Sequence, residues 1–97
     1  MVDVSIILVN YNTKELTTQC INSIFEKTEG ISFEVIVIDN NSKDGSVELL
    51  SSDKRIVFVE SGSNLGFGKA NNLGVENSNG KYIFFLNSDT LLLNNAV

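Results

Sequence analysis

Asp39 is the residue whose type and position point most directly to chemistry. It follows an apolar run at residues 34–38, where we expect a strand to end. A carboxylate at the end of a buried strand can accept a hydrogen bond from a ribose hydroxyl or a nucleobase N–H. The residues after it, Asn41, Ser42 and Asp44, are typical of a turn that caps a helix, and this simpler interpretation is favoured for those three.

Asn87 and Asp89 form a second candidate group, because they follow another apolar run at residues 82–86. Side chains two positions apart on a strand point to the same side, so Asp89 could hold one Mg²⁺ or Mn²⁺ with help from Asn87. Such a cation would allow a protein with a formal net charge of -5 to bind a diphosphate. An ordinary turn at the end of a strand explains the same residues, and the triplet alone favours that explanation.

The glycine-rich segment at residues 61–69 is the third candidate. It superficially resembles a phosphate-binding P-loop, but five residues separate Gly62 from Gly68, which is more than that motif allows. Ala70 also occupies the position where the motif needs a Ser or Thr to bind Mg²⁺. A loop that closes around a nucleotide and a plain glycine-rich connection therefore fit the spacing about equally well.

Strands and helices must position these residues, and the sequence predicts the two in alternation. Apolar, β-branched runs predict strands at residues 4–9, 34–38, 56–59 and 82–86. Helical spacing predicts helices from residue 16 to near Gly30, over residues 44–50 and over residues 69–77. This alternation predicts an α/β fold, namely a Rossmann-like, open, mainly parallel sheet of about four strands with helices on both faces.

Caps and packing positions of the helices also follow from the pattern. Asn12 is predicted to cap the first helix with Glu15 as its capping-box partner, and Asp44 or Ser42 is predicted to cap the second. The residues available for packing in the third helix are Ala70, Leu73 and Val75.

One edge of the predicted sheet should hold the whole site, because the carboxyl ends of parallel strands lie together. The polar segments expected there are residues 10–12, 39–42, 61–69 and 87–89. Asp39 would then meet the base or ribose of a nucleotide, and Asp89 would meet its phosphates through a divalent cation.

The composition excludes several classes of function. The chain has 97 residues, 42% of them hydrophobic and 20% charged, as is typical of one small globular domain. It has no histidine, which excludes Ser-His-Asp catalysis and histidine-ligated zinc within this chain. The acidic charge and the lack of a Lys or Arg run argue against nucleic acid or a membrane surface as the main partner. Cys20 is expected to be a buried apolar residue, and the short N-terminal apolar run is neither a signal peptide nor a membrane span, so a cytoplasmic location is expected.

In order and spacing, these segments resemble glycosyltransferase family two, and the resemblance extends over essentially the whole chain. The matching segments are the first strand with Tyr11-Asn12, the turn at residues 39–46, the series Asn64-x-Gly66-x-Gly68-x-Ala70-x-Asn72, and the segment at residues 86–90. The asparagine-rich form of these motifs is most similar to the rhamnosyltransferase-like branch, which builds bacterial surface polysaccharides, commonly from dTDP-rhamnose or related donors.

The resemblance implies that the chain is the nucleotide-sugar-binding half of a GT-A fold in an inverting, metal-dependent enzyme. Asp39 would contact the nucleobase, and Asp89 would ligate Mn²⁺ or Mg²⁺ as the last carboxylate of a DxD-type motif. The full enzyme would use a nucleoside-diphosphate sugar as donor and a glycan or lipid-linked molecule as acceptor. The donor-binding residues implied in this way are Val9, Tyr11, Asp39, Asn41, Asn64, Gly66, Lys69, Asn72, Asn87 and Ser88.

The chain departs from the family pattern at several positions, among them Val9, Asn10, Asn40 and Asn41, and two departures bear on the chemistry. Asn87 stands where the family has the first Asp of its metal motif, and the family's catalytic base has no counterpart here and is expected beyond Val97. We therefore expect residues 1–97 to be a truncated domain that is inactive alone and that self-associates through the apolar residues 91–93. The full enzyme would lie in the cytoplasm, peripheral at the inner face of the membrane. The alternative is a non-catalytic nucleotide-binding α/β module, which requires no metal at Asp89.

Overall fold

The structure is a computed structural model that describes residues 2–63 and 65–86. The predicted site residues Asn64, Asn87, Ser88 and Asp89 lie outside the described residues. Strand and helix alternate along the described chain, as the sequence predicts. The elements are β1 (Val2–Asn10), α1 (Lys14–Lys27), β2 (Phe33–Asp39), α2 (Ser46–Ser51), β3 (Val57–Glu60), α3 (Phe67–Glu76) and β4 (Gly80–Phe85).

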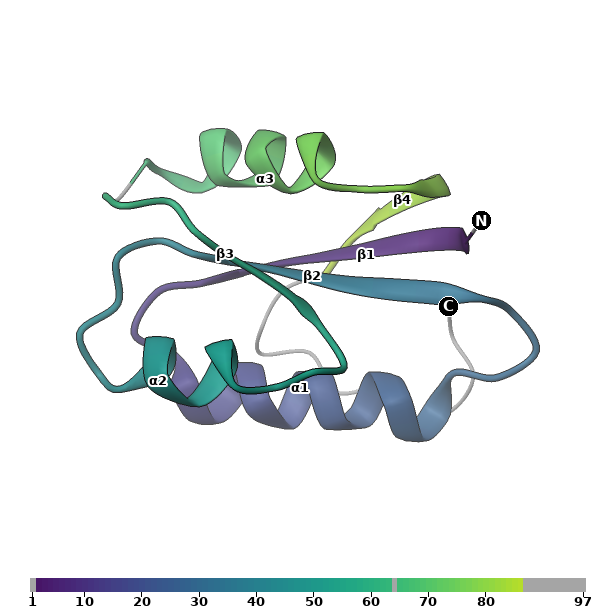
Figure 1. The fold of residues 1–97 in the computed structure, drawn as a ribbon, viewed down its shortest axis with the longest axis horizontal. Coiled ribbons are helices and arrows are strands. Elements are labelled where there is room, and N and C mark those ends of the chain that lie inside the picture. The colour runs from purple at the N-terminus through teal and green to yellow at the C-terminus, as the bar shows by residue number, and fades with distance from the viewer. Residues whose placement is uncertain (1, 64, 87–97) are drawn as a thin grey trace.

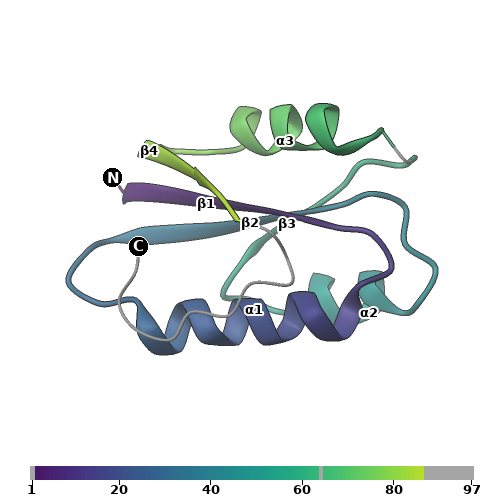
Figure 2. The ribbon, with the colours of Figure 1, turned by 180° about the vertical axis from the view of Figure 1, so that it is seen from behind.

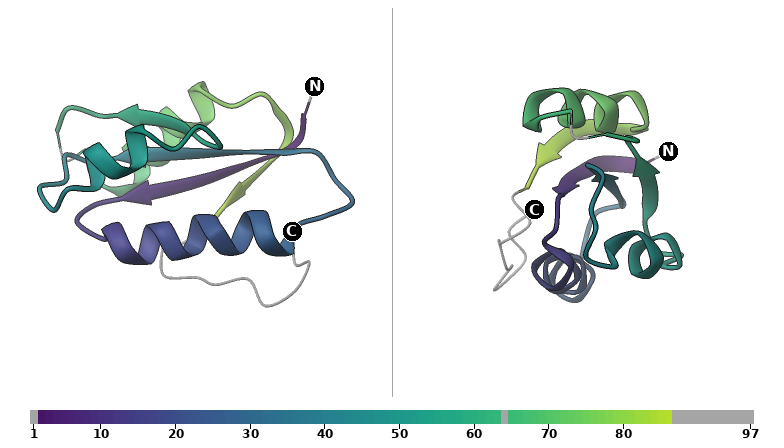
Figure 3. Two further views of the ribbon diagram at one scale, coloured as in Figure 1. Left: turned by 60° about the horizontal axis from the view of Figure 1, so that its bottom comes forward. Right: turned by 90° about the vertical axis from the view of Figure 1, so that its left-hand side faces the viewer.

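The described strands form one parallel sheet in the order β3-β2-β1-β4. Helices α1 and α2 cover one face and α3 covers the other (Figure 1). The right-hand view of Figure 3 shows the same three layers from another side, with α3 above the sheet and α1 and α2 below it. The predicted fold class, an open parallel sheet with helices on both faces, is therefore confirmed.

The two faces of β1 are buried in two separate apolar clusters. Ile6 and Leu8 point toward α1, where they pack with Ile21 and other residues of that helix and of α2. Ile7 and Val9 point the opposite way and pack with the α3 face of the sheet. Because alternate strand residues face opposite sides and both sides are covered, β1 needs a continuous apolar run rather than an alternating one. Cys20, on α1, is 0% exposed, so the prediction that it is buried is confirmed.

A close approach between α3 and β1 depends on a glycine. A Cβ atom added to Gly74 would lie 2.5 Å from Cγ2 of Ile7, a distance at which something must shift. Ala70, one turn earlier on α3, is fully buried, whereas Val75 is 40% exposed. The prediction that Val75 packs inward is therefore wrong, because the face of α3 that meets the sheet is the one bearing Ala70 and Gly74.

The predicted capping box of α1 is wrong as well. Asn12 has a positive φ of 53°, and the residue at the N-cap position is Thr13, which makes no side-chain cap hydrogen bond. The backbone N–H of Lys14 instead donates to Oδ2 of Asp44 at 3.0 Å. A side chain 30 positions away in the sequence thus binds the start of α1, which a local sequence motif cannot indicate.

The cap of α2 also differs from the prediction. Its N-cap position is Gly45, in the left-handed region at φ 89°. Asp44 still binds this helix start, because its Oδ1 accepts the backbone N–H of Ser46 at 3.1 Å. Ser42 does not cap the helix; its hydroxyl belongs to the polar cluster described below. None of the helices in the described ranges has the length and apolarity of a bilayer span.

Candidate functional site

The carboxyl ends of β1, β2 and β3 lie side by side at one edge of the sheet. Asn10 pairs in register with Asp39, and Asp39 with Glu60. Figure 2 shows the loops that follow these strands at the same end of the molecule as the first turns of α1 and α3. The order of the strands reverses between β1 and β4, and in open parallel sheets ligands bind outside the carboxyl ends of the strands near such a switch point.

Asn10 is the centre of a buried polar cluster at this edge. Its Nδ2 donates to Oδ1 of Asp39 at 2.7 Å and to Oγ of Ser42 at 3.0 Å. Its Oδ1 accepts hydrogen bonds from the hydroxyls of Thr13 at 3.0 Å and Thr17 at 2.7 Å. Asn10 is 0% exposed and Asp39 is 1% exposed. Both ends of the Asn10 amide are thus used, and one side chain ties β1 to β2 and to α1.

The Asp39 carboxylate is held by N–H groups on both of its oxygens. Oδ1 accepts the Asn10 amide, and Oδ2 accepts the backbone N–H of Ser42 at 2.9 Å. A buried carboxylate is costly unless it is hydrogen-bonded, so these two donors fix both its position and its orientation. Because Asp39 is only 1% exposed, a nucleobase can reach its carboxylate only after a local rearrangement that uncovers it.

The turn after β2 is joined to the loop after β1. The backbone N–H of Asn12 donates to Oγ of Ser42 at 2.9 Å, and the N–H of Lys43 donates to Oδ1 of Asn12 at 2.7 Å. Asn41 is exposed, with φ at 72°. The two loops therefore form one unit from which Asn41 projects.

Asp44 completes this unit between the starts of α1 and α2. The pKa of its carboxyl lies below the ordinary value, chiefly because it accepts a hydrogen bond from the Ser46 hydroxyl. Partial burial opposes this effect, and the backbone N–H groups of Lys14 and Ser46 add to it. The carboxylate form of Asp44 is thereby stabilised at both helix starts.

Asn40 links the end of β2 to the glycine-rich loop. It is 3% exposed, and its Oδ1 accepts the backbone N–H of Leu65 at 3.0 Å and the Ser61 hydroxyl at 3.2 Å. The Ser61 backbone N–H donates to the Asp39 carbonyl oxygen at 3.0 Å, and the Ser61 hydroxyl lies 2.9 Å from the same oxygen, so its single hydrogen is shared between this carbonyl and Asn40. Two consecutive residues therefore link the two candidate segments. Asp39 belongs to the buried polar cluster around Asn10, and Asn40 binds the loop before α3.

The other predicted donor-binding residues are divided between two places. Val9 lies near the carboxyl end of β1, and its side chain packs under α3. Tyr11 follows β1 and is 47% exposed. Gly66 is the N-cap position of α3 at φ 81°. Lys69 and Asn72 are exposed on the first two turns of that helix. The predicted gathering of the first three polar segments at one edge agrees with the structure, and the fourth segment lies outside the described residues.

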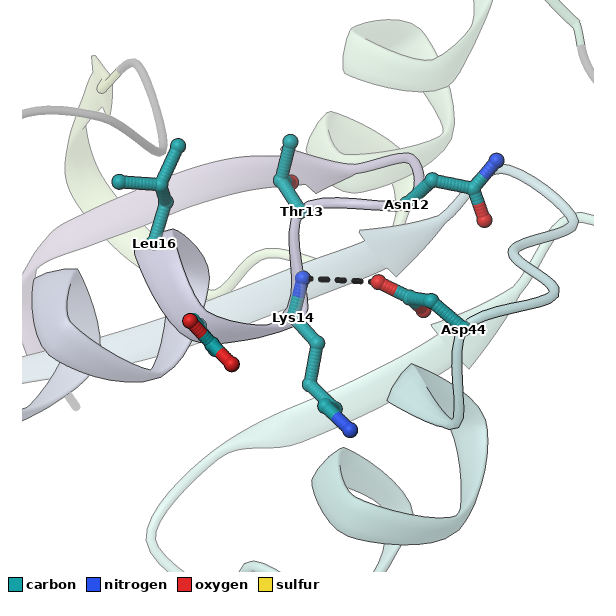
Figure 4. A pocket seen from close by; sticks show the side chains of 6 residues that line it. Asn12, Thr13, Lys14, Leu16 and Asp44 are labelled. Atoms are coloured by element: carbon teal, nitrogen blue, oxygen red, sulfur yellow. Dashed lines mark hydrogen bonds between the residues drawn. The ribbon is translucent and has the colours of Figure 1, made fainter.

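Two hollows lie beside the Asn10 cluster. One, of about 390 Å³, opens at the start of α1 and is shown in Figure 4, where the Lys14 backbone donates to Asp44. The other, of about 370 Å³, lies against the turn after β2, and its lining includes Asn41, Glu48 and Glu60. Lys43 lines this hollow too, but the two glutamates outweigh its single positive charge, so the hollow suits a diphosphate poorly without a neutralising cation. The residues that line the first hollow are Asn12, Thr13, Lys14, Glu15, Leu16 and Asp44.

A metal site cannot be assembled from the described residues alone. Within residues 2–63 and 65–86, no three His, Cys, Asp or Glu side chains lie close enough together to hold an ion. The predicted ligands Asn87 and Asp89 lie outside these ranges, so the metal stays a prediction.

Asn10, Asn40, Ser42 and Ser61 lie in the polar segments that the sequence predicts at this edge, but the sequence assigned none of them an individual binding role. Each is polar and stands at or just after the end of a strand, as Asp39 does. An uncharged amide or hydroxyl at such a position is also typical of an ordinary turn, so the residues alone gave no reason to single these four out.

The fold defines a class, that of α/β proteins with an open parallel sheet, in which ligands bind outside the carboxyl ends of the strands. Residues 5–97 match the model of glycosyl transferase family 2. The chain therefore belongs to glycosyl transferase family 2.

Curated relatives share this similarity over nearly the whole chain. An uncharacterised glycosyltransferase of Rickettsia bellii is 42% identical over 97 residues, which cover 97% of this chain and 14% of the relative. An uncharacterised glycosyltransferase of Haemophilus influenzae is 33% identical, over 97% of this chain and 39% of the relative. The chain thus spans well under half the length of these relatives.

Two solved structures in complex with nucleotide sugars have the same fold. S. aureus TarS in complex with UDP-GlcNAc superposes with a TM-score of 0.83 at 24% identity, covering 96% of this chain and 28% of that one. A mannosyltransferase from Pyrobaculum calidifontis, in complex with GDP-Man and Mn²⁺, has a TM-score of 0.83 at 21% identity, covering 98% of this chain and 31% of that one. At these identities the similarity establishes the fold.

Proposed function

We propose that this chain is the donor-binding part of an inverting, metal-dependent glycosyltransferase that transfers a sugar from a nucleoside diphosphate to an acceptor hydroxyl. The main structural support is the Asp39 carboxylate, which Asn10 and Ser42 fix at the carboxyl edge of the sheet. An oriented acceptor at that position suits the N–H of a nucleobase. Membership of family 2 and the nucleotide-sugar complexes of TarS and the mannosyltransferase support the same assignment.

In this proposal the base and the phosphates bind to different elements. Asp39 accepts a base N–H once it is uncovered, and Val9, Tyr11 and Asn41 line the base and ribose. Gly66, Lys69 and Asn72 lie on the loop and first turns of α3, where backbone N–H groups and an ammonium group suit a phosphate. The further donor-binding residues, outside the described ranges, are Asn64, Asn87 and Ser88.

The cation is Mg²⁺ or Mn²⁺, with Asp89 as its ligand, and it neutralises the leaving diphosphate when bound. The neighbour solved with GDP-Man and Mn²⁺ supports a divalent ion. The catalytic base and the glycan or lipid-linked acceptor site belong to the whole enzyme, for which we propose a role in bacterial surface polysaccharide synthesis with dTDP-rhamnose or a related donor. The cytoplasmic location, peripheral at the membrane, and self-association of the isolated chain stay predictions.

Calorimetric titration of the chain with UDP, dTDP and GDP, each with and without Mn²⁺, tests the proposal. The wild-type chain should bind one of them, and more tightly with Mn²⁺. Asp89→Ala should abolish the effect of Mn²⁺, and Asp39→Asn should weaken binding in both conditions. Asp3→Asn is the control, because Asp3 is exposed at the amino end of β1 and should bind like the wild type.

The outcome also separates the enzyme from a non-catalytic nucleotide-binding module. Such a module would bind a nucleotide equally well with and without Mn²⁺, and Asp89→Ala would then have no effect. No binding of any of the three nucleotides, in either condition, would contradict the proposed function.

A further inference from the structure

Asn10 lies beside Asp39 on the neighbouring strand, and its Nδ2 donates to Oδ1 of Asp39 at 2.7 Å. We propose that Asn10 is a positioning residue, which orients Asp39 so that its unused lone pairs face an N–H of the donor's base. This inference rests on the proposed function and extends it, because it assigns a role in base recognition to a fully buried side chain that does not itself meet the donor.

The orientation of the Asn10 amide is determined by its surroundings. A carboxylate only accepts hydrogen bonds, so the NH₂ end must face Asp39, at 2.7 Å. The hydroxyls of Thr13 and Thr17 can donate to the other end, at 3.0 and 2.7 Å. The reversed amide would place two oxygen atoms against each other at the Asp39 side, so only one orientation satisfies the cluster.

The hydrogen bonds to Asp39 leave it free acceptor capacity. A carboxylate offers about four acceptor sites, and Asn10 and Ser42 take one on each oxygen. Without the Asn10 amide, the Ser42 N–H would be the one donor to the carboxylate among the described residues, and the terminal torsion of an aspartate is broad. Loss of Asn10 should therefore let the carboxylate rotate away from the direction in which it meets the base.

Thr17 provides a matched control for this role. It is 0% exposed and donates to the far end of the same Asn10 amide. Thr17→Val removes that hydrogen bond with little change in shape and leaves the bond between Asn10 and Asp39 in place. A purely structural role for the cluster would respond to both substitutions, whereas a positioning role responds only to the loss of Asn10.

The test compares UDP with UDP methylated at N3, which lacks the base N–H, in calorimetric titrations of the full chain. Wild type and Thr17→Val should bind UDP about tenfold or more tightly than the methylated form, the effect of one hydrogen bond to a charged group. Asn10→Leu should reduce this ratio to near one, as should Asp39→Asn. GDP and GDP methylated at N1 are compared in the same way if the wild type prefers GDP.

The outcomes separate the inference from the proposed function. A wild-type ratio near one would overturn the contact between Asp39 and the base, and with it the positioning role of Asn10, while binding of UDP itself would still support the proposed function. A high ratio in wild type and in Asn10→Leu would overturn only the positioning role, as would a ratio that Thr17→Val lowers as much as Asn10→Leu. If circular dichroism shows that Asn10→Leu is unfolded, Asn10→Thr, which keeps a donor hydroxyl, should give an intermediate ratio; an unchanged ratio there also overturns the role.

Discussion

The Asp44 carboxylate binds the backbone N–H of Lys14, at 3.0 Å, across the gap between two helix starts. Its other oxygen binds the N–H of Ser46 at 3.1 Å. The Asp44 side chain thus accepts one backbone N–H at the start of α1 and one at the start of α2, so it caps both helices.

Asp44→Ala should lower the free energy of unfolding by about 1 to 2 kcal/mol, because both helix starts lose an acceptor. Asp44→Asn should cost less, since an amide oxygen can still bind one N–H. Urea unfolding followed by circular dichroism measures both. Equal stability of wild type and Asp44→Ala would show that water replaces the carboxylate without loss.

The same residue predicts a dependence of stability on pH. The pKa of Asp44 is lower in the folded protein than its ordinary value of 3.8, so the folded state favours the charged form. Its contribution should be fully present above pH 3.8 and should be lost as the pH falls through the lower, folded pKa. Unfolding curves between pH 6 and about pH 2 should therefore show the difference between wild type and Asp44→Asn shrink toward the acid end.

Gly74→Ala should destabilise the fold by about 1 to 3 kcal/mol, as overpacking of a core does. The new methyl group would lie 2.5 Å from Cγ2 of Ile7. Gly68→Ala on the same helix is the control, because a Cβ there meets nothing within 4 Å. That change should leave stability equal or raise it by about 1 kcal/mol, the helix propensity difference. Thermal unfolding of the two variants should give opposite shifts.

Asn40→Ala should free the glycine-rich loop from the end of β2. The Leu65 backbone N–H, which donates to Oδ1 of Asn40 at 3.0 Å, would lose its partner and should exchange with solvent deuterium faster. Asn41→Gly is the matched control, since the Asn41 side chain is exposed and glycine tolerates its positive φ of 72°. Amide exchange measured by NMR distinguishes them, and identical Leu65 exchange in both variants would exclude the tether.

Cys20 should be unreactive in the folded protein. Its side chain is 0% exposed in the apolar cluster between α1 and the sheet. A thiol reagent should therefore label it only when the chain opens, and labelling should speed up in urea in step with loss of the circular dichroism signal. Rapid labelling in buffer without denaturant would mean that α1 opens locally.

The strands were predictable because both faces of the central pair are buried, which requires apolar residues at consecutive positions. The run from Val4 to Val9 satisfies this condition at all positions except Ser5. The observed strand β1 is longer than the predicted one by two residues at the amino end and one at the carboxyl end. The edge strand β3 begins one residue later than predicted, at Val57. Family membership, indicated by ordered motifs, agrees with the match over residues 5–97.

The caps and the polar cluster could not be predicted, because their partners are distant in sequence. The donor that Asp44 binds at Lys14 is 30 positions away, and Asn10 meets Asp39 across 29. A local pattern assigns such residues to the nearest helix, as it did for Asn12. Asp39 was found because a charged residue directly after a buried strand is uncommon, whereas Asn10 has an uncharged amide and gives no comparable signal.

The central position of β1 sets an order in which the chain can complete its fold during synthesis. Its neighbour β2 follows within 40 residues, but its other neighbour, β4, begins only at Gly80. Until then one edge of β1 lacks a partner, and Ile7, Val9, Ile36 and Ile38 await the helix that covers them. A nascent chain that still lacks α3 and β4 therefore exposes an apolar surface at the ribosome exit, where it can aggregate or bind chaperones. This exposure ends when α3 and β4 emerge.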